Sequence, residues 1–331
     1  MKCDQVKYVE LCVVVKCSLR QFAEALGDRA NRTPPTVGKD IIIGDASKLT
    51  KARLAQLLNH AAELNVPFLI RNYASRFGQM GKSPQTSDIM AYLTYQRDNG
   101  RPDATVQVQG GREEKVNYES MIQYFNSASE SRPRIWNSLD NPVECDPQLV
   151  EKFQRPAFID DDDLIEFGLN FPRDSHMLRG GVKIPSYRRW LLVGSRFSVT
   201  GFHRDAMGFW TAVELQKGSK DWFWVEQNEE NVGHLNINGQ FDSVSKFTRI
   251  FHIRIGPGDL FIMNPGRIHA VVGPEDSFAA GTHFVLRKTL GESMRLAKED
   301  MEFSHLTNDP DTNALGFYHQ LLRVLILTRR C

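Results

Sequence analysis

The second half of this 331-residue chain is dominated by short β-type runs that are separated by glycine, proline, asparagine and aspartate. Several short strands with turn-forming residues at this spacing are typical of a β-sandwich or β-barrel. We therefore expect an all-β core in this part of the chain. The predicted strands are Trp190–Thr200, Phe209–Leu215, Asp221–Val225, Phe247–Ile255, Leu260–Met263, Ile268–Val272 and Phe278–Leu286.

Helical and strand-type patterns alternate in front of this core. Apolar residues recur at helical spacing from Ser47 to about Asn65, and we expect Ser47 to act as the N-cap. Residues 1–132 therefore read as a helical and mixed α+β region that packs on the core. The other elements predicted there are strands over 66–70 and 105–109 and helices over 88–93 and 118–125.

The last part of the chain, residues 291–331, is again of helical type. We expect its helix to pack on the core, with dimerisation as the alternative, and the sequence does not determine the oligomeric state. The apolar stripe of this helix consists of Leu315, Tyr318, Leu322, Leu325 and Ile326.

Composition indicates a soluble globular protein. Hydrophobic residues make up 41% of the chain and charged residues 24%, with a formal net charge of +1. A dedicated nucleic-acid binder would carry a basic excess to contact phosphates, and we find no direct nucleic-acid motif. The four-residue acidic run at 160–163 is interpreted as a solvated loop or helix start, in preference to a metal or basic-peptide site.

The cysteines and the apolar run near the N-terminus indicate in which cellular compartment the protein is expected. The five cysteines are odd in number and contain no CxxC pair, which predicts reduced thiols and neither a disulfide nor a zinc framework. The run around Val13 to Val15 is interrupted by Glu10 and Lys16, so it is too short for a signal peptide or a membrane span. A cytoplasmic or nuclear protein is expected.

Three residues have the types and spacing of metal ligands. His203 and Asp205 stand two positions apart at the end of a β-type run, where extended geometry directs both side chains to the same side. His269 follows the turn at Asn264–Gly266 and begins another strand. Two imidazoles and one carboxylate on one face leave coordination positions open, as non-haem Fe(II) oxygenases require, and zinc is the alternative metal.

Lys220 and Thr200 strengthen this interpretation. Lys220 lies on a predicted hairpin that returns to the same core, and a buried lysine must find an anion, such as the distal carboxylate of 2-oxoglutarate. Thr200 offers a hydroxyl to the same carboxylate. An exposed hairpin lysine is the alternative for Lys220. Trp222 and Trp224 are interpreted as core residues and not as substrate-stacking residues.

These residues resemble those of the JmjC oxygenases, and within them the branch of histone lysine demethylases that is often linked to PHD or F-box modules. Thr200-x-x-His-x-Asp205 is similar to the first metal motif, and Lys220 falls where the family places its 2-oxoglutarate lysine. The likeness is best from about residue 134 to residue 286. Its other parts are Arg134–Leu139, Pro265–Val272, Glu275–Ser277 and Gly281–Phe284.

The resemblance implies an α+β fold with a double-stranded β-helix, the jelly-roll or cupin-like JmjC barrel, over residues 133–290 and flanking helices. It also implies catalysis with Fe(II) at His203, Asp205 and His269, with 2-oxoglutarate as co-substrate near His283. In this family O2 and 2-oxoglutarate are consumed, succinate forms, and a C–H bond of a protein or peptide is oxidised. The first candidate is N-methyl-lysine of a histone tail, and the resemblance favours the nucleus.

Some residues depart from the family pattern. Val213 stands where that branch usually has a tyrosine that contacts 2-oxoglutarate, and His283 stands where it tends to have asparagine. Ala206–Trp210 replaces a glycine-rich stretch and would narrow a methyl-lysine pocket. Two alternatives therefore remain beside demethylation, namely a JmjC hydroxylase that leaves the alcohol in place and a catalytically silent JmjC scaffold or binding module.

Overall fold

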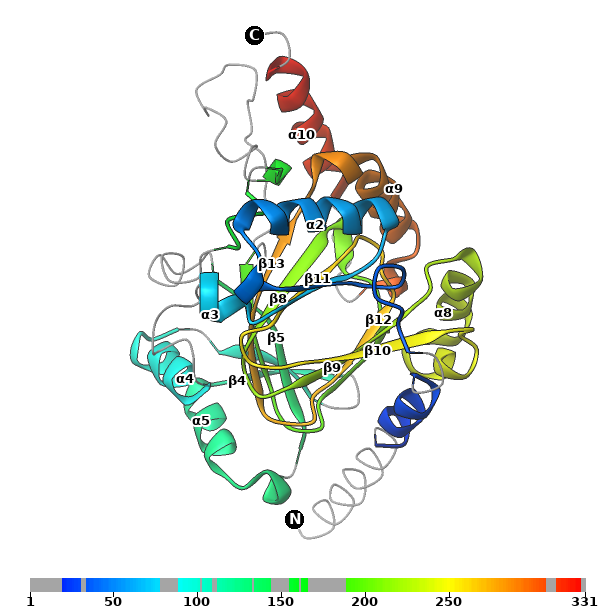
Figure 1. Ribbon diagram of the computed structural model, residues 1–331. Helices are drawn as coiled ribbons and strands as arrows, with labels where there is room; N and C mark the ends of the chain where they lie inside the picture. Colours follow the sequence, from blue (N-terminus) through cyan, green and yellow to red (C-terminus); the bar gives the residue numbers. More distant parts are fainter. Residues whose placement is uncertain are drawn as a thin grey trace.

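The computed structural model describes ten stretches of the chain, and all five cysteines and the apolar run near the N-terminus lie outside them (Figure 1). The thiol prediction is therefore not tested. No helix in the described stretches is long and apolar enough to cross a membrane. The described stretches are residues 20–30, 34–77, 89–101, 103–108, 112–132, 134–143, 155–160, 162–165, 189–307 and 314–328.

Strands of the described residues form two sheets, one of nine strands and one of four. The larger has the order β1-β2-β11-β8-β13-β6-β5-β3-β4 and the smaller the order β10-β9-β12-β7. With the helices around them, these largely antiparallel sheets give a mixed α+β fold compatible with a jelly-roll. The strands are β1 (Ile42–Asp45), β2 (Phe68–Arg71), β3 (Ala104–Val108), β4 (Arg112–Val116), β5 (Trp136–Pro142), β6 (Arg189–Gly194), β7 (Val199–His203), β8 (Trp210–Lys217), β9 (Lys220–Val225), β10 (Ile250–Ile255), β11 (Leu260–Met263), β12 (His269–Val272) and β13 (Ser277–Phe284).

The predicted strand Trp190–Thr200 is wrong as a single element. The structure divides it into β6 and β7, which belong to different sheets. Between them the backbone N–H of Ser198 donates to the carbonyl of Ser195, and Phe197 adopts a left-handed φ of 68°. A bulky residue seldom adopts this conformation, so the apolar pattern alone did not indicate the turn.

The strands before residue 132 extend the large sheet. β2 pairs with β11, and β3 pairs with β5. The predicted helices are present as α2 (Lys51–Leu64), α4 (Ile89–Asp98) and α5 (Tyr118–Asn126), with a short α3 (Tyr73–Phe77). The prediction of Ser47 as N-cap is wrong, because the Thr50 hydroxyl accepts the N–H of Arg53 and begins α2.

Helix α8 (Glu229–Asp242) was not predicted from the sequence. The Asn228 side chain caps it by accepting the N–H of Asn231, but only Asn231 and Leu235 are buried, so the helix has little apolar periodicity. Gly239, at φ 73°, interrupts its regular geometry. A Cβ added to Gly201 of β7 would lie 2.9 Å from Cβ of Gln240, so glycine allows α8 and β7 to approach closely.

Helices α9 (Leu290–Glu302) and α10 (Ala314–Thr328) follow the last strand (Figure 1). The prediction that the C-terminal helix packs on the core is confirmed, since Phe317, Tyr318 and Leu321 are buried. Its buried face differs from the predicted stripe, because Phe317 and Leu321 belong to it and Ile326 is 54% exposed.

The acidic run at 160–163 is only partly solvated. Asp162 is exposed, but Asp163 is buried and pairs with Arg155 at 2.5 Å. One Asp163 oxygen accepts the backbone N–H groups of Ile165 and Val285, both at 3.0 Å. The solvated-loop interpretation is therefore wrong for Asp163, whose carboxylate joins this segment to the end of β13.

Candidate metal centre

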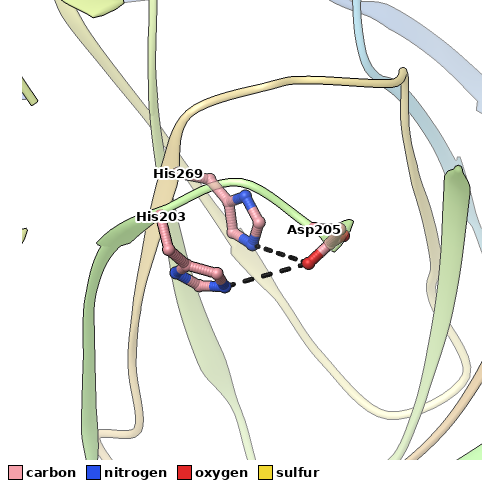
Figure 2. Close-up of side chains that lie close together, drawn as sticks. All are labelled: His203, Asp205 and His269. Atoms are coloured by element: carbon pink, nitrogen blue, oxygen red, sulfur yellow. Dashed lines mark ion pairs between the residues drawn. The ribbon is translucent and has the colours of Figure 1, made fainter. Parts of the chain in front are cut away.

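Three side chains of metal-ligand type converge where β7 ends and β12 begins (Figure 2). His203 ends β7 and His269 starts β12, and the antiparallel register places them opposite each other. The Oδ1 atom of Asp205 lies 3.8 Å from Nε2 of each histidine. One ligand atom from each residue lies within 4.8 Å of the others, an arrangement that could hold one metal ion.

Hydrogen bonds to the backbone orient both imidazoles. Nδ1 of His203 lies 2.8 Å from the carbonyl oxygen of Gly201, and Nδ1 of His269 lies 2.9 Å from that of Arg267. Because a carbonyl oxygen only accepts, Nδ1 carries a proton in each ring, and Nε2 is the nitrogen that faces the other two residues. Burial, followed by the neighbouring His269, lowers the pKa of His203 to about 4. The His203 ring is therefore neutral at pH 7, as a metal ligand must be.

The carbonyl that holds His269 belongs to a buried arginine. The Arg267 guanidinium donates to the Asn264 side chain at 3.1 Å, to the Val225 carbonyl at 3.1 Å and to the Asn65 carbonyl. Its burial lowers the pKa of Arg267 to about 10, so the group remains charged at pH 7. This network ties the loop before His269 to the end of α2.

The Asp205 carboxylate is held from its other side by Thr211 of β8. The Thr211 hydroxyl donates to Oδ2 of Asp205 at 2.5 Å, and Nδ1 of His283 lies 3.1 Å from the same hydroxyl. Since a hydroxyl has a single hydrogen, His283 is the donor in the second bond. Burial alone raises the pKa of Asp205, but His269, His203 and these polar neighbours outweigh it and hold the pKa below its ordinary value.

A cavity enclosing about 730 Å³, its open mouth included, lies beside the three ligand-type residues. Its walls come from both sheets. Thr200, Lys220 and His283 all line it, so the structure brings together every residue that the sequence singled out. The remaining lining residues are Leu139, Trp190, Leu192, His203, Asp205, Ala206, Phe209, Thr211, Val213, Trp222, Met263, His269 and Val271.

Lys220 is buried at the wall of this cavity, with 3% of its surface exposed. No acidic side chain in the described stretches forms an ion pair with its Nζ atom, and burial lowers the pKa of Lys220 to about 8. The alternative of an exposed hairpin lysine is therefore wrong. A buried ammonium group without a counter-charge fits a carboxylate ligand.

Thr200 is supported by a residue that the sequence did not single out. Nδ2 of Asn137 donates to the Thr200 hydroxyl oxygen at 3.1 Å, which leaves the hydroxyl hydrogen available to a ligand. Asn137 is on β5, 63 residues earlier in the chain. Asn137 lies in the Arg134–Leu139 segment that resembles the JmjC oxygenases, but nothing in that segment assigned it a role, and Thr211 belongs to no motif.

Aromatic and aliphatic side chains form the rest of the cavity wall. Trp222 and Trp224 are both buried, which confirms their place in the core, but Trp222 also lines the cavity and stacks on His269 with ring centroids 6.0 Å apart. Val213 lies at the wall without any polar atom in its side chain. The cavity therefore lacks a tyrosine hydroxyl at this position.

Comparisons with known proteins find sequence similarity to JmjC domain-containing proteins. No protein-family model matches the chain. It is 27% identical over 191 residues to the JmjC domain-containing histone demethylation protein 1 of Debaryomyces hansenii, covering 52% of this chain and 35% of that protein. It is 23% identical over 252 residues to the protein of the same name from Kluyveromyces lactis, covering 72% and 49%.

The likeness extends beyond fungi. The Caenorhabditis elegans protein of the same name is 25% identical over 252 residues, covering 70% of this chain and 23% of that protein. The chain therefore spans about half or less of these relatives' lengths. The chain is therefore similar in sequence to the JmjC-domain histone demethylation proteins, and it also contains the converging histidine and aspartate side chains described above.

Proposed function

We propose that this protein is an Fe(II)- and 2-oxoglutarate-dependent dioxygenase that oxidises a protein side chain. One observation supports the proposal: His203, Asp205 and His269 line the same cavity as Lys220, which is buried and pairs with no acidic side chain of the described residues. A structural zinc site would not require a buried lysine beside it. The same proposal assigns residues 133–290 to a double-stranded β-helix, with 1–132 and 291–331 as flanking regions.

The three ligand residues would bind the metal on one face. Their backbone and Thr211 hydrogen bonds orient them in advance, so little reorganisation accompanies metal binding. Two nitrogen ligands and one oxygen ligand suit Fe(II) and leave positions for a bidentate co-substrate and O2. When bound, Fe(II) and 2-oxoglutarate supply the oxidising chemistry by which a C–H bond is converted.

Lys220 and Thr200 would hold the distal carboxylate of 2-oxoglutarate. The ammonium group supplies the positive charge, and the Thr200 hydroxyl, which accepts from Asn137, donates its own hydrogen. His283 lies at the same cavity and is anchored to Thr211, so it borders the co-substrate site. The apolar walls exclude water from the reacting C–H bond.

The relatives' names point to histones as the substrate. We therefore take N-methyl-lysine of a histone as the first candidate and the nucleus as the compartment. Val213 and His283 motivate the two alternatives, a hydroxylase and a silent binding module, because both residues alter the cavity beside the metal cluster.

The test is turnover of 2-oxoglutarate. We expect succinate from protein loaded with Fe(II) under O2, and mass spectrometry of a histone peptide library should show the loss of one methyl group. A gain of one oxygen would identify the hydroxylase instead. Absence of succinate with every peptide, coupled or uncoupled, would remove both enzymatic assignments.

Two variants and a metal control sharpen this test. His203→Ala should bind no Fe(II), and Lys220→Met should bind Fe(II) but lose affinity for 2-oxoglutarate in calorimetry. Zinc-loaded protein should form no succinate. Tight zinc binding with no affinity for 2-oxoglutarate would favour a structural zinc module.

A further inference from the structure

The segment that carries Asp205 has a conformation that it does not stabilise by itself. Met207 and Gly208 both adopt left-handed φ angles of 63° within the short helix Ala206–Gly208. Methionine rarely adopts this conformation, because its Cβ comes close to the following carbonyl oxygen. Such geometry persists only when surrounding structure holds it.

Helix α10 contacts this segment from outside the cavity. The hydroxyl of Tyr318, which is fully buried, donates to the carbonyl oxygen of Met207 at 2.7 Å. The ring of Phe317 meets that of Phe209 edge-on, with centroids 5.7 Å apart. Phe209 lines the cavity on its other side, so α10 lies one side chain away from the site.

Helix α9 holds the same segment at two further points. A Cβ at Gly208 would lie 2.1 Å from the carbonyl oxygen of Ser293, so the loop backbone rests directly on the helix backbone. Arg204, between two of the ligand-type residues, is buried and contacts Asp300 at 2.7 Å and Glu299 at 3.1 Å. Both helices thus fix the backbone on each side of Asp205.

We propose that α9 and α10 form part of the metal site, with Tyr318 as a positioning residue that fixes the Met207 carbonyl and thereby the direction of the Asp205 carboxylate. This inference rests on the proposed function. Asp205 lies outside β7 and is held by no strand ladder, unlike His203 and His269. Thr211 holds the Asp205 carboxylate, and the backbone on each side of it is positioned by contacts from residues about 100 positions later in the chain.

Tyr318→Phe tests the proposal because it removes one hydroxyl and leaves the ring. Tyr124→Phe is the matched control, since the Tyr124 hydroxyl also donates to a backbone carbonyl at 2.7 Å, that of Arg134 on the path into β5. Both variants should lose similar thermal stability. Only Tyr318→Phe should raise the dissociation constant for Mn(II), by about 10-fold, in anaerobic calorimetry.

An absorption spectrum distinguishes a change in metal coordination from a general loss of stability. Protein loaded with Co(II) should show a changed d–d absorption band in Tyr318→Phe and an unchanged band in Tyr124→Phe. Wild-type affinity and an unchanged band in Tyr318→Phe would overturn the inference while the proposed function stands. A wild-type protein that binds neither metal would overturn both. If Tyr318→Phe does not fold, Phe317→Leu provides the same readouts, with a rise of about 3-fold expected.

Discussion

Replacing Lys220 with methionine should stabilise the protein while it removes co-substrate binding. The lysine is charged at pH 7 in both the folded and the unfolded chain, but in the folded chain it is buried and pairs with none of the acidic side chains that the structure describes. The fall of its pKa from 10.5 to about 8 corresponds to about 3 kcal/mol, at about 1.4 kcal/mol for each pKa unit. Methionine fills a similar volume without this penalty.

The stability difference between the wild type and Lys220→Met should depend on pH. Between pH 8 and pH 10.5 the unfolded chain binds more protons at Lys220 than the folded chain, so the free energy of unfolding of the wild type rises with pH. The methionine variant lacks this rise. The free energy of unfolding of Lys220→Met should therefore exceed that of the wild type by about 3 kcal/mol at pH 7, or roughly 5 °C in Tm. This difference should shrink toward zero near pH 10.5.

Urea denaturation of the metal-free protein at pH 7 and pH 10 measures the stability difference between the two proteins and its decrease with pH. With Mn(II) present throughout, addition of 2-oxoglutarate should raise the urea midpoint of the wild type further and leave that of Lys220→Met at its Mn(II)-bound value. Lys298→Met, on an exposed face of α9, is the control and should change stability by less than about 0.5 kcal/mol. A Lys220→Met protein less stable than wild type at pH 7 would refute the reasoning.

Three further substitutions test other parts of the structure. Gly208→Ala should lower the free energy of unfolding by about 3 kcal/mol or more, because its φ is left-handed and the new Cβ would lie 2.1 Å from the Ser293 carbonyl oxygen. Gly239→Ala has open space around the new Cβ and should lower it by about 1 kcal/mol. Equal urea midpoints for the two variants would contradict this reasoning. Asn137→Ala should weaken 2-oxoglutarate binding about 10-fold in calorimetry with unchanged Mn(II) affinity, because the threonine hydroxyl loses its donor, and equal weakening of both ligands would argue against this role. Arg267→Met should lower the free energy of unfolding by about 3 kcal/mol, since buried carbonyl groups lose their donor, and a loss below about 1 kcal/mol would show that the network matters little.

The β-rich core was predictable because turn-forming residues bound most of its strands. Prediction failed where local pattern and tertiary structure disagree. The turn at 195–198 carries an apolar Phe197 in a left-handed conformation, so the run around it reads as one strand. Helix α8 has only two buried residues, Asn231 and Leu235, and depends on its cap and its contact with β7.

The candidate site was predictable in so far as its residues lie close together in sequence or follow recognisable spacings. His203 and Asp205 are two positions apart, and His269 follows a turn sequence, Asn264–Gly266, that predicts the start of a new strand. Asn137 and Thr211 enter the site only through strand pairing and packing, which spacing along the chain does not report. The resemblance to JmjC proteins supplied the co-substrate assignment.

Helix α10 is synthesised after every residue of the metal cluster, with Tyr318 lying 49 positions beyond His269. A nascent chain therefore carries all three ligand side chains before the contact with the Met207 carbonyl exists. If Tyr318 positions Asp205 as proposed, full metal affinity should therefore appear only after the end of the chain has been synthesised and α10 has packed on this segment.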